Sequence, residues 1–194
     1  FTLDSHAMVT ATALSGGRTW SRDLVPAGEN PNSGPGGGIA YEGGRVFVAT
    51  GYGELMGLDA ASGNVVWRQR LGVAVGGAPT VQNGIVYVTN RAATGFAVRA
   101  SDGKLLWQVE GIPQPTGITG VAAPAVEGDL VVFPFASGQL LAVDRETGIE
   151  RWSGQVAGTR PGRAVSSIRD MSGDPVIAGD RVYGGTSSGR IAAF

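Results

Sequence analysis

The chain contains 194 residues, with 33 glycines and no cysteine. The lack of cysteine excludes a disulfide framework, a thiolate metal site and a cysteine nucleophile. Its 15 basic and 16 acidic residues give a formal charge of −1, which argues against a nucleic-acid partner because phosphate binding needs a concentrated basic surface. No apolar run reaches the length of about 18 residues that a membrane-spanning helix needs.

A ten-residue motif occurs three times, at 58–67, 98–107 and 143–152, and every copy ends in tryptophan. The three tryptophans of the motif and one earlier tryptophan occupy the same place in successive units: Trp20, Trp67, Trp107 and Trp152. Their spacing of 40 to 47 residues matches a four-stranded propeller blade and is too long for a leucine-rich or ankyrin repeat. The sequence therefore predicts an all-β protein, a β-propeller of four-stranded antiparallel blades.

The chain begins inside a partial blade, residues 1–20. Its second, third and fourth strands are expected at 1–4, 8–14 and 18–20, so that the innermost strand is missing.

Three complete blades are expected at 36–71, 76–110 and 121–156. The last of them shows the pattern most clearly, with a buried strand at 130–135 and an alternating strand at 139–144 between glycine-containing turns.

A second partial blade, 172–194, stops where the aspartate turn and the tryptophan strand of the motif should follow. Propellers close rings of about 4–8 blades. The chain is thus either a small ring of about four blades or roughly half of a larger one, and its abrupt ends favour a fragment.

The repeated motif has a structural explanation. Asp59 and Asp144 precede Ser/Thr-Gly at the spacing of an Asx-type turn, in which the carboxylate accepts backbone N–H bonds while Gly63 or Gly148 adopts a positive φ. We interpret these aspartates as structural, and the tryptophans as filling the space between blades instead of stacking on a cofactor.

The connections between blades differ in length. From tryptophan to the proline that opens the next blade, 12 positions separate 67 from 79, 17 separate 107 from 124, and 23 separate 152 from 175. Antiparallel strand order places these connections on one rim, where lengthened loops tend to carry binding residues. Among their residues are two isoleucines expected as exposed anchors and three arginines that fit either a solvated loop or a partner-facing one: Ile112, Ile118, Arg160, Arg163 and Arg169.

The Ala-x-Asp-x-x-Thr-Gly-x-x-x-Trp pattern resembles the pyrroloquinoline-quinone-type propeller repeat over nearly the whole chain. The stretch 168–177, Ile-Arg-Asp-Met-Ser-Gly-Asp-Pro-Val-Ile, is similar to an interblade segment of the BamB family, propeller lipoproteins of the outer-membrane β-barrel assembly machine. The repeat specifies the fold more than the function, since quinoprotein dehydrogenases and non-enzymatic scaffolds share it.

This resemblance implies about half of an eight-bladed, non-catalytic scaffold in the periplasm. It implies docking on the periplasmic domains of the assembly barrel protein, of the BamA type, and anchoring to the outer membrane through a lipid that is not part of this chain. No catalytic residue, cofactor or metal is expected.

The resemblance also implies partner-binding positions. A Leu-Arg pair precedes one blade-opening Ala-Pro in the family, and Ile118 and Thr119 occupy the matching positions. Paired acids precede another blade-opening proline; Asp170 matches the first acid, Ser172 stands at the second, and Asp174 is a candidate to supply the missing charge. Arg169 completes the set.

Two other functions stay open. One is a fragment of a quinone-dependent dehydrogenase, which by resemblance would hold its quinone on a tryptophan platform with Ca²⁺, carboxylates and often a vicinal disulfide. Here the tryptophans occupy repeat positions, and the only histidine, His6, is expected to be a surface residue. The other is a substrate-binding or sensor propeller.

Overall fold

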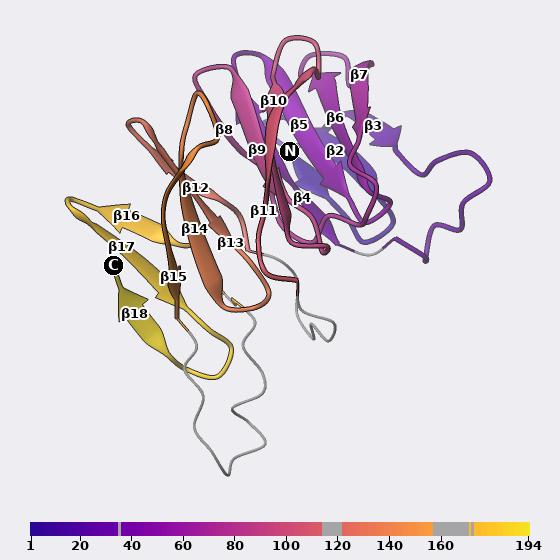
Figure 1. Ribbon diagram of the computed structural model, residues 1–194. Coiled ribbons are helices and arrows are strands. Elements are labelled where there is room, and N and C mark those ends of the chain that lie inside the picture. The colour runs from indigo at the N-terminus through magenta and orange to yellow at the C-terminus, as the bar shows by residue number, and fades with distance from the viewer. Residues whose placement is uncertain (35, 114–121, 157–170, 172) are drawn as a thin grey trace.

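The computed structural model describes residues 1–34, 36–113, 122–156, 171 and 173–194 (Figure 1). In this part of the chain the secondary structure consists of β-strands, arranged in five antiparallel sheets in which every strand pairs with its neighbour in sequence. Within the same ranges, no helix has the length and apolar character that a membrane crossing requires.

The sheets follow one another along the chain. The first contains β1 (Thr2–Leu3), β2 (Met8–Thr12) and β3 (Arg18–Asp23). The second contains β4 (Gly37–Glu42), β5 (Arg45–Thr50), β6 (Glu54–Asp59) and β7 (Val65–Arg70). The third contains β8 (Thr80–Gln82), β9 (Ile85–Thr89), β10 (Thr94–Arg99) and β11 (Leu105–Glu110). The fourth contains β12 (Ala125–Glu127), β13 (Leu130–Pro134), β14 (Gln139–Asp144) and β15 (Glu150–Gln155). The fifth contains β16 (Val176–Ala178), β17 (Arg181–Gly185) and β18 (Ile191–Ala193).

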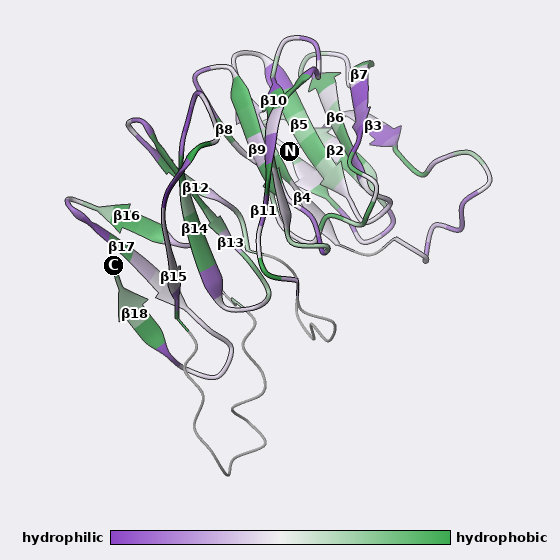
Figure 2. Cartoon of the chain, viewed as in Figure 1, coloured by the Kyte–Doolittle hydropathy of each residue, from purple (hydrophilic) through white to green (hydrophobic). Residues whose placement is uncertain are grey.

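Hydrophobic layers between successive sheets form the core. Phe47 of β5 belongs to one layer with Val86 of β9, and Tyr87, on the other face of β9, belongs to the next layer with Phe133 of β13. The middle strands are therefore buried on both faces. Figure 2 shows the consequence for composition, with β5, β9 and β14 largely hydrophobic and the outer strands β3 and β7 largely hydrophilic.

Each tryptophan of an outer strand lies opposite a small residue of the preceding strand. Trp67 pairs with Gly57, and a Cβ added to Gly57 would come within 2.4 Å of the Trp67 ring. The ladder shifts register immediately after the small residue, as in a β-bulge. The same shift follows three other pairs: Trp20 with Ala11, Trp107 with Ala97, and Trp152 with Ala142.

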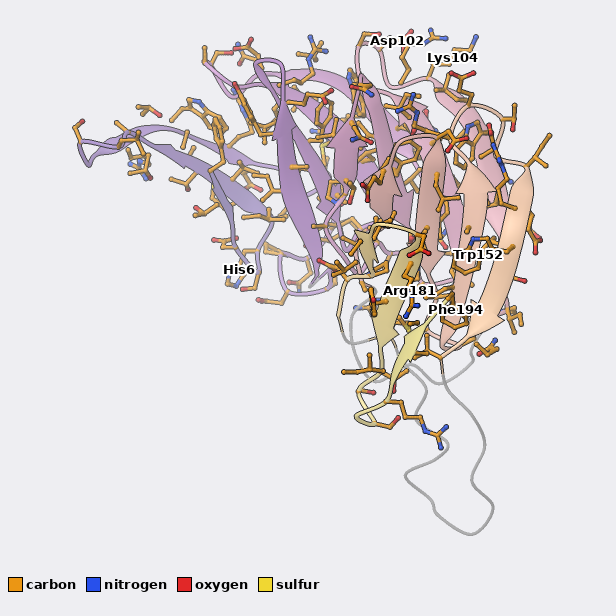
Figure 3. The ribbon with its side chains drawn as sticks, turned by 90° about the vertical axis from the view of Figure 1, so that its left-hand side faces the viewer. His6, Asp102, Lys104, Trp152, Arg181 and Phe194 are labelled. Carbon is orange, nitrogen blue, oxygen red and sulfur yellow. The ribbon has the colours of Figure 1, made fainter. Side chains whose placement is uncertain are left out.

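The fifth sheet differs from the middle ones in having one open face. Along β17, Val182 and Gly184 are buried whereas Arg181 and Tyr183 are exposed. Tyr87, which stands at the position of Tyr183 in the third sheet, is fully buried. Trp152 of β15, in the fourth sheet, stacks on Phe194, which follows β18 of the fifth sheet, with ring centroids 5.6 Å apart (Figure 3).

Candidate docking rim

The strands alternate in direction, so the loops between them gather on two opposite rims. The connections between sheets and the turns between second and third strands share the connection rim, whereas the remaining turns form the turn rim. In Figure 3, His6 lies on the connection rim and Asp102 and Lys104 lie on the turn rim. The connection 71–79 is tied to its own rim by backbone hydrogen bonds, from Val75 N–H to Thr50 O (3.3 Å) and from Arg91 N–H to Ala74 O (3.0 Å).

The connections between sheets run over residues 24–36, 71–79, 111–124 and 156–175. The connection 24–36, which has no blade-opening proline to measure from, is also longer than 71–79. It is held to the rim by the Tyr52 hydroxyl, which donates to Asn30 O (2.8 Å), and by a 3.1 Å contact between His6 Nε2 and Asn32 Oδ1. Lengthening is therefore not confined to the later connections.

Most of the predicted partner-binding positions lie outside the described residues: Ile118, Thr119, Arg169, Asp170 and Ser172, and with them Arg160 and Arg163. Asp174 and Ile112 lie within them. The Ile112 side chain is 52% exposed at the start of its connection, while its backbone N–H donates to Gln139 Oε1 (2.8 Å).

Asp174 joins the last residues of two connections. Its Oδ1 accepts a hydrogen bond from the backbone N–H of Ala123, at 2.6 Å. Ala123 leads into the fourth sheet and Asp174 leads into the fifth, so this bond brings together the ends of 111–124 and 156–175. The hydrogen bond could not be read from the sequence, because the two residues lie 51 positions apart.

The repeated aspartates form the predicted Asx-type turns. Asp59 Oδ1 accepts from the Ser62 N–H (2.9 Å) and hydroxyl (2.7 Å), which holds the pKa of Asp59 below its ordinary value. Asp144 Oδ1 accepts from the Thr147 N–H (3.0 Å) and hydroxyl (2.9 Å). Its Oδ2 accepts from Arg151 Nη2 (2.6 Å), and this hydrogen bond is the main reason that the pKa of Asp144 is strongly lowered. The predicted Asx-type turns are confirmed.

The indole N–H of three repeat tryptophans donates a hydrogen bond to a backbone carbonyl of the next sheet. Trp67 Nε1–H donates to Ala100 O (2.9 Å) in the next sheet. Two further indoles make the equivalent bond, from Trp20 to Ala60 O (3.0 Å) and from Trp107 to Arg145 O (3.2 Å). These three rings lie between sheets, as the repeat predicted.

Other features of the rim bear on ligand binding. Two hollows of about 340 Å³ and 300 Å³, both bordered by Arg70, were not anticipated from the sequence; the larger reaches from the connection rim along β10 and β11. The larger is lined by Leu71, Val73, Asn90, Phe96, Leu105 and Gln108, among others. Across the part of the chain that the structure describes, no group of three or more His, Asp or Glu side chains is arranged to hold a metal ion.

Comparison with known proteins identifies the family. The family description "Outer membrane protein assembly factor BamB" matches residues 5–194. Proteins of that name from Nitrosomonas eutropha and Bordetella pertussis are 28% and 29% identical to this chain, each over 81% of its length. The matches cover 38% and 40% of those two proteins, so the chain spans less than half of either relative.

Solved structures confirm the fold class, a partial β-propeller. The crystal structure of BamB from Moraxella catarrhalis superposes with a TM-score of 0.81 at 23% identity, covering 98% of this chain and 56% of that one. Quinohemoprotein alcohol dehydrogenase from Comamonas testosteroni superposes with a TM-score of 0.71 at 17% identity, covering 99% of this chain and 40% of the enzyme. Both likenesses concern the fold, whereas the family match extends over almost all of the sequence: the chain belongs to the BamB family of outer membrane protein assembly factors.

Proposed function

We propose that this chain is part of a non-catalytic periplasmic scaffold for outer-membrane protein assembly. The observation that carries the proposal is the BamB family match over residues 5–194. In this proposal the complete protein is held at the outer membrane by a lipid anchor, and the five described sheets belong to an eight-bladed ring with blades at 1–20, 36–71, 76–110, 121–156 and 172–194.

The partner in this proposal is the periplasmic part of the assembly barrel protein, of the BamA type. The docking patch comprises residues of two consecutive connections: Ile118, Thr119, Arg169, Asp170, Ser172 and Asp174. The hydrogen bond between Ala123 and Asp174 supports this grouping, since it joins the two connections at their ends. Binding hot spots combine an apolar anchor with a charged neighbour, as Ile118 and Asp170 would do in this patch.

Surface plasmon resonance on immobilised periplasmic domains tests the patch. Ile118→Ala and Asp170→Ala in the complete propeller should each weaken binding by about 1–3 kcal/mol, roughly 5-fold to 150-fold. Glu127→Ala is the matched control, because Glu127 ends β12 on the turn rim. Equal affinities for the three variants would remove the connection rim from the proposal.

The proposal assigns no catalytic residue, cofactor or metal. Its alternative, a piece of a quinone-dependent dehydrogenase, has the fold likeness to quinohemoprotein alcohol dehydrogenase in its favour. Titrating the chain with pyrroloquinoline quinone and Ca²⁺, followed by absorbance and calorimetry, separates the two. Saturable one-to-one binding at micromolar affinity would favour the enzyme.

A further inference from the structure

The segments that precede β12 and β16 are joined by the side chain of Asp174, and the repeat has no carboxylate at the equivalent position of the third or fourth sheet. We infer that Asp174 is a positioning residue: its carboxylate braces the end of connection 156–175 against the end of connection 111–124. The charge of Asp174 is then not what a partner recognises. The hydrogen bond between Ala123 and Asp174 stands whatever the function is. That it shapes a docking surface rests on the proposed function.

The contact has the properties of a structural hydrogen bond. The Ala123 N–H donates to Asp174 Oδ1 at 2.6 Å, and Ala123 is 9% exposed. A buried backbone N–H needs an acceptor, and a carboxylate is a stronger acceptor than a neutral group. The carboxylate therefore supplies the acceptor that this buried amide needs.

The register of the repeat shows that this acid is particular to one junction. The residue before the blade-opening proline is Ala78 in the third sheet and Ala123 in the fourth, and only in the fifth is it an acid, Asp174. Only the junction of the fourth and fifth sheets, between the two longest connections, thus has a carboxylate at this position.

The preceding junction uses a different link, which the fourth sheet cannot repeat. Between the third and fourth sheets, the Thr80 hydroxyl donates to Pro124 O at 2.5 Å. The residue at the register of Thr80 in the fourth sheet is Ala125, which has no hydroxyl. The bond from Ala123 to Asp174 is the link between the fourth and fifth sheets at this point.

The lead-in to the fifth sheet is also fixed at a second point. Met171 is buried in the layer between the fourth and fifth sheets and forms an antiparallel bridge with Thr186, in the turn between β17 and β18. Met171 thus holds the segment to its own sheet, and Asp174 holds it to the neighbouring one.

Two variants of Asp174 distinguish its role as a hydrogen-bond acceptor from a role of its negative charge. Asp174→Asn removes the charge but keeps an Oδ1 acceptor, whereas Asp174→Ala removes both. We expect the Ala123 amide, followed by hydrogen exchange in NMR spectra, to exchange within about 3-fold of wild type in Asp174→Asn and at least about 10-fold faster in Asp174→Ala. Asp180→Ala is the control, since this exposed aspartate of the fifth sheet lies on the turn rim.

Binding of the same three variants to the immobilised periplasmic domains gives the second readout. Asp174→Ala should bind about 3-fold to 10-fold more weakly than wild type, and Asp174→Asn, which keeps the Oδ1 acceptor, should lose clearly less binding than Asp174→Ala. Unchanged exchange at Ala123 in Asp174→Ala would overturn the brace. Loss of binding in Asp174→Asn with exchange at Ala123 unaltered would assign the charge to the partner and overturn the positioning role. Failure of the wild-type chain to bind would overturn the proposed function, and the exchange data would still decide the brace.

Discussion

Trp67 of the second sheet lies against Gly103 of the third, so closely that a Cβ on Gly103 would stand 2.6 Å from the indole ring. Gly103 also has a φ of +76°, a backbone conformation that disfavours side chains. The indole donates its hydrogen bond three residues earlier, to Ala100 O. The glycine of the repeated motif is thus required both by the turn that contains it and by the tryptophan of the preceding sheet.

Gly103→Ala should therefore lower the free energy of unfolding by about 2–4 kcal/mol, since strain at positive φ adds to overpacking against Trp67. Gly84→Ala is a matched control in the same sheet: Gly84 also has a φ of +76°, but a Cβ there would meet nothing within 4 Å. Urea denaturation should show a cost of about 1 kcal/mol for the control. Equal losses in both variants would show that contact with the indole adds nothing.

Trp67→Ala should cost about 3–5 kcal/mol, because a buried ring is lost from the layer between two sheets and the Ala100 carbonyl loses its donor. Leu14→Ala, at a fully exposed position, should change stability by less than about 0.5 kcal/mol. The measurement is again urea denaturation, and a cost for Trp67→Ala as small as that of the control would contradict the core role of the ring.

The sequence allowed these sheets and contacts to be predicted wherever the repeat governs them. The expected strand 139–144 coincides with β14, and the Asx-type turns at Asp59 and Asp144 were read from spacing alone. Strand ends were less accurate. The expected strand 8–14 ends at Thr12, since Ala13 enters a turn closed by hydrogen bonds with Gly16 and Gly17.

Contacts outside the repeat could not be predicted. The brace between Ala123 and Asp174 and the contact between His6 and Asn32 join residues of non-repeating connections, and such pairs leave no periodic signal in the sequence. The contact between each tryptophan and the small residue opposite it, in contrast, belongs to the repeat. Gly57 and Ala97 stand at a constant offset before their tryptophans, so the steric need could have been inferred from the motif.

Acid should weaken the fold through Asp144. Its pKa is lowered from an ordinary value of 3.8, first by the hydrogen bond from Arg151 and then by those from Thr147. A carboxyl group whose pKa is lower in the folded state stabilises the fold above its unfolded pKa, and this contribution is lost as the pH falls toward the folded pKa. We therefore expect Asp144→Asn to be less stable than wild type at pH 7 and to lose less stability on acidification below about pH 4.

Urea midpoints measured from pH 7 to pH 2 for both proteins provide the comparison. Glu127→Gln, an exposed carboxylate with no hydrogen bond among the described residues, should follow the wild-type curve. Parallel curves for wild type and Asp144→Asn would show that Asp144 does not contribute to the acid dependence.

Tyr87 contrasts with Asp144 because its polar group lies inside the layer between the third and fourth sheets. Its side chain is fully buried, its hydroxyl has no hydrogen-bond partner among the described residues, and burial raises the pKa of this phenol to about 12. Because an unpaired buried hydroxyl is costly, Tyr87→Phe should leave stability unchanged or raise it by up to about 1 kcal/mol in urea denaturation. A loss of more than 1 kcal/mol would reveal a hydrogen bond to this hydroxyl.

The proposed docking of the connection rim on the assembly barrel protein can be tested by site-specific photo-crosslinking in intact cells. A photoreactive phenylalanine analogue would replace Ile118 in one variant and Glu127, on the turn rim, in the other. We predict a crosslink to the barrel protein from position 118 and none from position 127. A crosslink from position 127 alone, or equal crosslinks from both, would contradict docking through the connection rim.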